Sequence, residues 1–212
     1  RRGLYSLLGR TQSGVELLPR SHFFLLRALE EWAAEDPRIR DIVRLQLIGN
    51  CDATDLDLVA RSSVPEMVEA TGYLDHQETL GHVRNADVLF LPLHKVAPGK
   101  RATIVPGKTY EYLAAGRPIL AAVPPGDARD FVQRSGSGMV CGPEEVGRMV
   151  DLLKDQFARW SSGVAGREAN SNGGFPQFER QALTEEFSRE LDRVCRGGRG
   201  GTIRGGIETS QA

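Results

Sequence analysis

Strand-length apolar runs alternate with segments of helical periodicity along most of this chain. The clearest runs, residues 88–93 and 119–123, contain no polar residue, which is typical of strands covered on both faces. Strands that alternate with helices form parallel sheets, because each helix carries the chain back across the sheet. The pattern therefore predicts an α/β fold, a Rossmann-like parallel sheet with helices on both faces, with residues 88–93 near its centre.

The boundaries of these elements follow from local signals. Ser21 and Asp75 are predicted N-caps and Gly116 a predicted C-cap. We expect strands at residues 4–8, 43–48, 68–74, 88–93, 118–123 and 139–140. We expect helices at residues 21–35, 53–61, 107–115, 126–134, 144–160 and 177–194, and one of about ten residues after Asp75.

Length and composition predict one folded domain with appendages. The 212 residues are enough to bury a core. Residues 1–160 read as a Rossmann-like domain, for which the loops and the resemblance below supply the ligand, and residues 161–176 as a loop rich in Ser, Gly and Asn. Residues 177–195 read as a C-terminal helix that packs back on the domain, and residues 196–212 as a disordered tail. Because the chain opens at Arg1 without an initiator Met, we expect it to be a fragment.

Charge and cysteine content exclude several classes of function. Lys and Arg number 27 against 28 Asp and Glu, so a generally basic nucleic-acid surface is not expected. Cys51, Cys141 and Cys195 are far apart and form no CxxC pair, which predicts a reducing compartment without disulfide or metal site. No apolar run is long enough to span a membrane, and no signal peptide is recognised, so we expect a cytoplasmic protein.

The loops that follow the strands are the expected ligand sites of such a fold, and residues 106–111 are the most informative of them. Pro106 and Gly107 open a helix whose free N–H groups and partial positive charge suit a phosphate. Lys108 adds a full charge. Glu111, one turn later, could accept hydrogen bonds from the two hydroxyls of a ribose; alternatively, it is a surface residue favoured by the first helical turn.

Rival motifs are absent. A dinucleotide-binding domain requires GxGxxG after the first strand, and residues 9–14 do not supply it. A P-loop requires GxxxxGK[ST], but Ala102 stands where the first glycine belongs. No GxSxG, HExxH or metal-ligand cluster is found, so hydrolases and metalloenzymes are not expected.

Three blocks carry a resemblance to a known family: TGYLDHQE at residues 71–78, NADVLFLPL at 85–93 and IVPGKTYEYLAAGRPILA at 104–121. In order and spacing they resemble the C-terminal, donor-binding domain of family 4 (group 1) retaining glycosyltransferases with the GT-B fold. The resemblance implies a carbohydrate-biosynthesis transferase that uses a UDP- or GDP-linked sugar as substrate and needs no metal or other cofactor. It also implies an N-terminal acceptor domain, missing here, as partner.

The resemblance also assigns roles to individual residues. Glu111 would hold the donor ribose, while the backbone of Pro106, Gly107 and Thr109 would face the diphosphate or the sugar. Thr103 stands where many members have a sugar-facing glutamate, which leaves the donor open.

A metal-independent transferase needs a cation beside its leaving diphosphate. Lys108 is the first candidate and Arg20 the second, although a solvated Arg20 is as plausible. The basic loop of residues 94–105 begins at His94, which we include in the donor site. Its residues Lys95, Lys100 and Arg101 either serve the phosphates or keep the loop solvated.

Gly72, Tyr73 and Leu74 lie where relatives hold the base. Tyr73 either stacks on the base or is a half-buried packing residue, and the second interpretation is favoured. Two hypotheses remain for the chain. In the first it is half of an active transferase, which could rest on the inner face of a membrane; in the second it is a non-catalytic nucleotide or nucleotide-sugar-binding module that serves as a regulatory or partner subunit.

Overall fold

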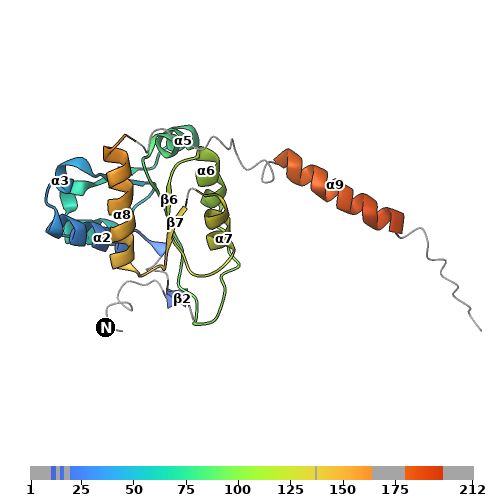
Figure 1. The fold of residues 1–212 in the computed structure, drawn as a ribbon, viewed down its shortest axis with the longest axis horizontal. Coiled ribbons are helices and arrows are strands. Elements are labelled where there is room, and N and C mark those ends of the chain that lie inside the picture. Colours follow the sequence, from blue (N-terminus) through green and yellow to red (C-terminus); the bar gives the residue numbers. More distant parts are fainter. Residues whose placement is uncertain (1–10, 13–14, 17–19, 137, 164–179, 198–212) are drawn as a thin grey trace, which may run out of the picture. The chain divides into compact units, whose positions relative to one another are not determined.

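The structure is a computed structural model that describes residues 11–12, 15–16, 20–136, 138–163 and 180–197 (Figure 1). The chain divides into two compact units, Arg1–Gly174 and Phe175–Ala212. The site lies in the first unit. Of the second unit, the structure describes one helix, α9 (Arg180–Gly197), which ends two residues after the expected end at residue 195.

The strands of the described core pair in parallel, as the sequence predicted. β3 (Leu45–Ile48) pairs with β4 (Val68–Gly72). β5 (Leu89–Pro92), β6 (Ile119–Ala122) and β7 (Gly138–Cys141) form a second sheet in that order. The expectation that residues 88–93 are central is wrong for the described strands, because β6 occupies the middle of this sheet. The apolar run of β5 reflects helices on both faces and not a central position.

The N-terminal segment differs from the predicted loop. Two short strands, β1 (Thr11–Gln12) and β2 (Val15–Glu16), form an antiparallel pair where only a loop was expected. The strand predicted at residues 4–8 lies outside the described residues, as do most of the loop at 161–176 and the tail from residue 198.

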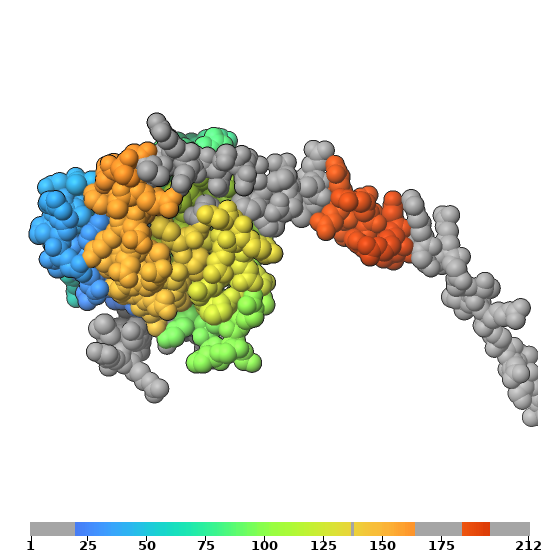
Figure 2. Space-filling view, viewed as in Figure 1, coloured from blue at the N-terminus to red at the C-terminus, as the bar shows by residue number. Residues whose placement is uncertain are grey.

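Helices cover both faces of the β5–β6–β7 sheet (Figure 1). On one face, α2 (Phe23–Glu35) and α8 (Val146–Ser161) pack together, with the rings of Trp32 and Phe157 in edge contact at 5.5 Å (Figure 2). Leu120 and Ala122 of β6 belong to this core. Since side chains alternate along a strand, the equally buried Ile119 and Ala121 point to the other face, beside α6 (Gly107–Ala115) and α7 (Asp127–Arg134).

The helix boundaries agree with the sequence signals to within about two residues. α4 (Ala53–Ala60) and α5 (His76–Asn85) begin with capping boxes built on Asp52 and Asp75. α2 starts at Phe23, whose N–H donates to Ser21 Oγ over 3.2 Å. Two short helical turns, α3 (Ile39–Ile42) and η2 (Pro65–Met67), were not predicted, because each is shorter than the periodicity that reveals a helix.

Candidate functional site

The first turn of α6 is open to solvent. Pro106 is its N-cap in an extended conformation, and no side chain caps the helix. Gly107 and Lys108 are exposed, and a Cβ added at Gly107 would meet nothing within 4 Å. The Thr109 amide donates to Pro106 O over 2.9 Å. The backbone of Gly107 and Lys108 is therefore open to solvent, a condition that the predicted phosphate-binding helix start requires.

Charged groups from distant parts of the chain meet at this helix start. The pKa of Lys108 lies below the usual lysine range, first because surrounding protein desolvates its ammonium group and second because the positive charge of Arg20 repels it; Glu111 opposes the shift. Lys108 nevertheless keeps exposed surface. Arg20 and Glu111 therefore lie within electrostatic range of Lys108.

Thr109 lies beneath this turn. Its side chain is 0% exposed, and its Oγ1 has no hydrogen-bond partner. Most buried hydroxyls are paired, so this one is an exception. Pro106 is buried as well. In this conformation the side chains of Thr109 and Pro106 cannot touch a ligand in solvent, and their contribution to a site is the placement of the helix backbone.

The segment after β4 presents an aromatic ring to solvent. Tyr73 is 76% exposed, so the favoured interpretation of Tyr73 as a half-buried packing residue is wrong. Gly72 has a positive φ of 74°, and its carbonyl accepts from Gly49 N over 2.9 Å. Leu74 is half-buried. The positive φ at Gly72 turns the chain out of the sheet, which leaves the Tyr73 ring available for stacking.

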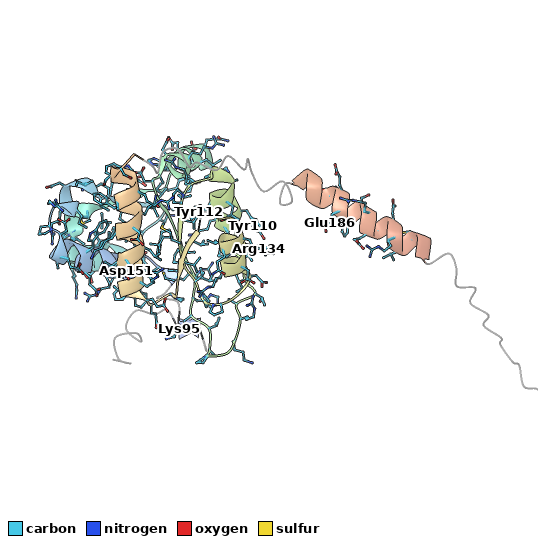
Figure 3. All side chains as sticks on the ribbon, in the orientation of Figure 1. Lys95, Tyr110, Tyr112, Arg134, Asp151 and Glu186 are labelled. Carbon is cyan, nitrogen blue, oxygen red and sulfur yellow. The ribbon has the colours of Figure 1, made fainter. Side chains whose placement is uncertain are left out.

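The basic loop of residues 94–105 uses two of its cations within the protein. Lys95 Nζ lies 2.6 Å from Glu144 Oε2 (Figure 3), and Arg101 Nη2 lies 2.6 Å from Asp130 Oδ2. Lys100 and Thr103 are exposed, and His94 is half-buried. Both ion pairs hold the loop to residues before or on the helices that follow β7 and β6, a role that neither interpretation of the sequence included.

Sequence analysis missed two features of the site. Tyr112 follows Glu111 on α6, and burial, with a smaller effect of Glu111, raises its pKa, so the phenol stays neutral. Ala102 forms a parallel bridge with Gly126, which ties the loop before α6 to the loop before α7. The signal in the sequence for the second feature was the glycine at position 126, at the start of the helix predicted for residues 126–134.

Searches of the described residues for two further features were negative. They contain no group of three or more His, Cys, Asp or Glu side chains that could hold a metal ion. None of their helices combines the length and apolar character needed to cross a membrane.

Comparison with known proteins identifies relatives of this chain. The family model described as glycosyl transferases group 1 matches residues 17–157. Sucrose synthase of Solanum tuberosum is 25% identical over 182 residues, which cover 78% of this chain and 22% of that protein. The chain therefore spans about a fifth of the curated relative that it matches.

Two solved structures share the fold. An α,α-trehalose 6-phosphate synthase from Burkholderia multivorans superposes with a TM-score of 0.61 at 14% identity, covering 90% of this chain and 43% of that one. Alr3699/HepE of Anabaena, determined in complex with UDP, gives 0.54 at 17% identity, covering 91% and 52%. Both neighbours are GT-B glycosyltransferases, and each is about twice as long as the part that this chain matches.

Proposed function

The chain belongs to the group 1 glycosyl transferases, and we propose that it is the donor-binding domain of an enzyme that transfers a sugar from a nucleotide-diphosphate sugar to an acceptor. The observation that carries this proposal is the open first turn of α6, which no side chain caps and where Arg20 and Glu111 lie within electrostatic range of Lys108. Two cations and free backbone N–H groups favour a diphosphate. The carboxylate beside them favours a ligand that also offers hydroxyl donors.

Lys108 and Arg20 are the groups proposed to assist the chemistry. When the bond between the anomeric carbon and the diphosphate oxygen breaks, negative charge accumulates on the leaving oxygen. Preorganised positive charge lowers the energy of that transition state. The ammonium of Lys108 and the guanidinium of Arg20 supply it, together with the amides of Gly107 and Lys108.

The remaining proposed contacts are with the nucleoside of the donor. Glu111 accepts hydrogen bonds from the ribose hydroxyls, and the exposed ring of Tyr73 stacks on the base. Gly72 and Leu74 contact the base through their backbone groups. The amides of Gly107 and Lys108 face the diphosphate, and Pro106 and Thr109 place these amides at the start of the helix. Thr103 and His94 lie on the loop proposed to face the transferred sugar.

Several finer properties belong to the same proposal. Retention of the anomeric configuration, independence of metal and use of UDP- or GDP-linked sugars rest on the resemblance of the α6 segment to the family. The N-terminal acceptor domain is proposed because the chain spans 43% and 52% of its two solved neighbours. A cytoplasmic position, with the intact protein at the inner face of a membrane, follows the same resemblance.

Calorimetric titration of the chain with UDP, GDP and ADP tests the donor site. We expect one of them to bind more tightly than about 1 mM, a free energy of about 4 kcal/mol, and Glu111→Ala to weaken that binding about tenfold or more. Glu31→Ala, which removes an exposed carboxylate of α2, is the matched control. If all three nucleotides bind no better than millimolar, the donor site is refuted for this chain.

A second candidate is a non-catalytic module that binds a nucleotide or nucleotide sugar and serves a partner protein. The observation in its favour is Thr103, exposed in the loop where many relatives carry a glutamate. Consumption of the nucleotide sugar distinguishes the two functions. If the chain is part of a transferase, it should consume a UDP- or GDP-sugar when it is joined to its acceptor domain. If it is a binding module, it should bind the nucleotide sugar without consuming it. Transfer by the isolated chain would contradict the need for an acceptor domain.

A further inference from the structure

The path of the loop before α6 is set by the neighbouring segment between β6 and α7. Ala102 N donates to Pro125 O over 2.8 Å, and Ala102 O accepts from Asp127 N over 2.9 Å. Ala102 is 5% exposed. The N–H and C=O groups of Ala102 are therefore both hydrogen-bonded, four residues before Pro106, the N-cap of α6.

Gly126 permits this close approach. A Cβ at Gly126 would lie 2.1 Å from the carbonyl oxygen of Ala102 and 2.7 Å from its nitrogen. Such separations are far inside van der Waals contact, and the obstructing atoms are backbone and cannot rotate away. Any side chain at position 126 must therefore push the loop off its present path.

An ion pair supports the same contact from outside. Arg101 Nη2 lies 2.6 Å from Asp130 Oδ2 and 3.9 Å from Asp127 Oδ1. The three side chains are 42–58% exposed, so solvent screens their attraction and the pair contributes less than the backbone bridge. Its geometric effect remains, because it holds the loop against α7.

α7 is in turn held against α6. The rings of Tyr110 and Phe131 lie 6.3 Å apart, and the guanidinium of Arg134 covers the Phe131 ring at 5.0 Å. Figure 3 shows Tyr110 and Arg134 on these two adjacent helices. A loop fastened to α7 is thereby fastened relative to the first turn of α6.

We propose that the Ala102–Gly126 bridge and the Arg101–Asp130 ion pair, together called the loop clamp, position Thr103 and the first amides of α6 for the donor. This inference rests on the proposed function. Arg101, Asp130 and Gly126 are positioning residues, because they act on the donor through residues 102–107 and touch it nowhere in this arrangement.

Hydrogen exchange of the chain without ligand tests the clamp independently of nucleotide binding. Gly126→Ala and Asp130→Asn are expected to speed exchange in the peptide covering residues 94–108, the first more than the second, and to leave residues 45–72 unchanged. Asp151→Asn, which removes an exposed carboxylate of α8 (Figure 3), is the matched control. Unchanged exchange at residues 94–108 in both variants overturns the proposal.

Nucleotide affinity tests the positioning role. Using the nucleoside diphosphate that the chain binds best, we expect Asp130→Asn to weaken affinity about two- to fivefold, the range of an exposed ion pair. Gly126→Ala should weaken it about tenfold or more, and Arg101→Lys, which keeps the charge, should stay within about twofold of wild type.

The two tests separate failure of the clamp from failure of the donor site. If wild type binds no nucleotide, the proposed function fails, and the exchange experiment alone decides whether the clamp orders the loop. If wild type binds and exchange accelerates while affinity stays constant in both variants, the loop is clamped but does not position the donor, and the inference is wrong.

Discussion

The pH dependence of nucleotide binding should report the ionisation of Lys108. In the free protein its pKa lies below the usual lysine range, because of desolvation and of Arg20. A bound diphosphate favours the charged ammonium and raises that pKa again. Proton linkage then requires the affinity to be greatest below the pKa of the free protein and to fall as pH rises from there to the pKa of the complex.

The size of the fall follows from the exposure of Lys108. A hydrogen bond to a charged group is worth about 1.5–3 kcal/mol, and the solvent-accessible surface of Lys108 places it at the lower end because solvent screens the charge. A loss of about 1.5 kcal/mol is about tenfold in affinity. The charge of the phosphates is constant in this range, since the second phosphate pKa is about 6. The uracil or guanine ring of UDP or GDP loses a proton at high pH, but equally for wild type and variants, so the fall due to Lys108 is the difference between wild type and a variant that does not titrate at this position.

Calorimetry from about pH 8 upward, where the phosphate is fully ionised, supplies the assay. Wild type should lose about tenfold in affinity, beginning before the ordinary lysine pKa is reached. Lys108→Arg should show no such fall, because the guanidinium does not titrate. Lys154→Arg, at an ion pair between α8 and Glu35 of α2, should follow wild type. If Lys108→Arg and wild type share one pH profile, Lys108 does not contact the phosphates.

Three further predictions concern the fold around the site. Cys141 is 1% exposed, and burial raises its pKa to about 12, so a thiol reagent at pH 8 should modify it only when the protein unfolds. The exposed Cys195 should react first, followed by Cys51, whose pKa is raised by burial and by two neighbouring aspartates. Early modification of Cys141 would contradict its place in the core. Leu120→Ala, at a fully buried position of β6, should lower the free energy of unfolding in urea by about 2–5 kcal/mol, and a loss below about 1 kcal/mol would show that β6 is not central to the core. Thr109→Val removes an unpaired buried hydroxyl at constant shape, so the free energy of unfolding should stay constant or rise by about 1 kcal/mol; a clear decrease means that the hydroxyl has a partner.

The parts of the site that could be predicted are those specified by neighbouring residues. Pro106 at the N-cap and Gly116 in the left-handed conformation, with φ 65°, bound α6 where the sequence placed it, because caps depend on a few adjacent residues. Parallel pairing followed from the alternation of strands and helices. The capping boxes at Asp52 and Asp75 are local in the same sense.

The parts that could not be predicted join residues far apart in the sequence. Neither the approach of Arg20 to Lys108 nor the Ala102–Gly126 bridge follows from a local pattern, since both depend on how the loops lie over the edge of the sheet. The exposure of Tyr73 likewise depends on the packing of other segments, which leave most of this side chain uncovered. Composition and spacing identify the kind of residue at a site, whereas packing decides which of them meet.

The first turn of α6 carries two unfavourable features. Several exposed cations of this unit lie beside carboxylates, as in the pairs of Arg40 with Glu66 and Arg101 with Asp130. At this turn Lys108 is instead repelled by Arg20, an effect that Glu111 opposes, and directly beneath it the Thr109 hydroxyl is buried without a partner. Departures of this kind concentrate at functional sites, and a bound anion would compensate the first of them, whereas the Thr109 side chain stays out of reach of a ligand. An anion bound at the open amides would turn the repulsion between two cations into attraction by both, which explains how a conformation unfavourable in isolation becomes favourable once a diphosphate is present.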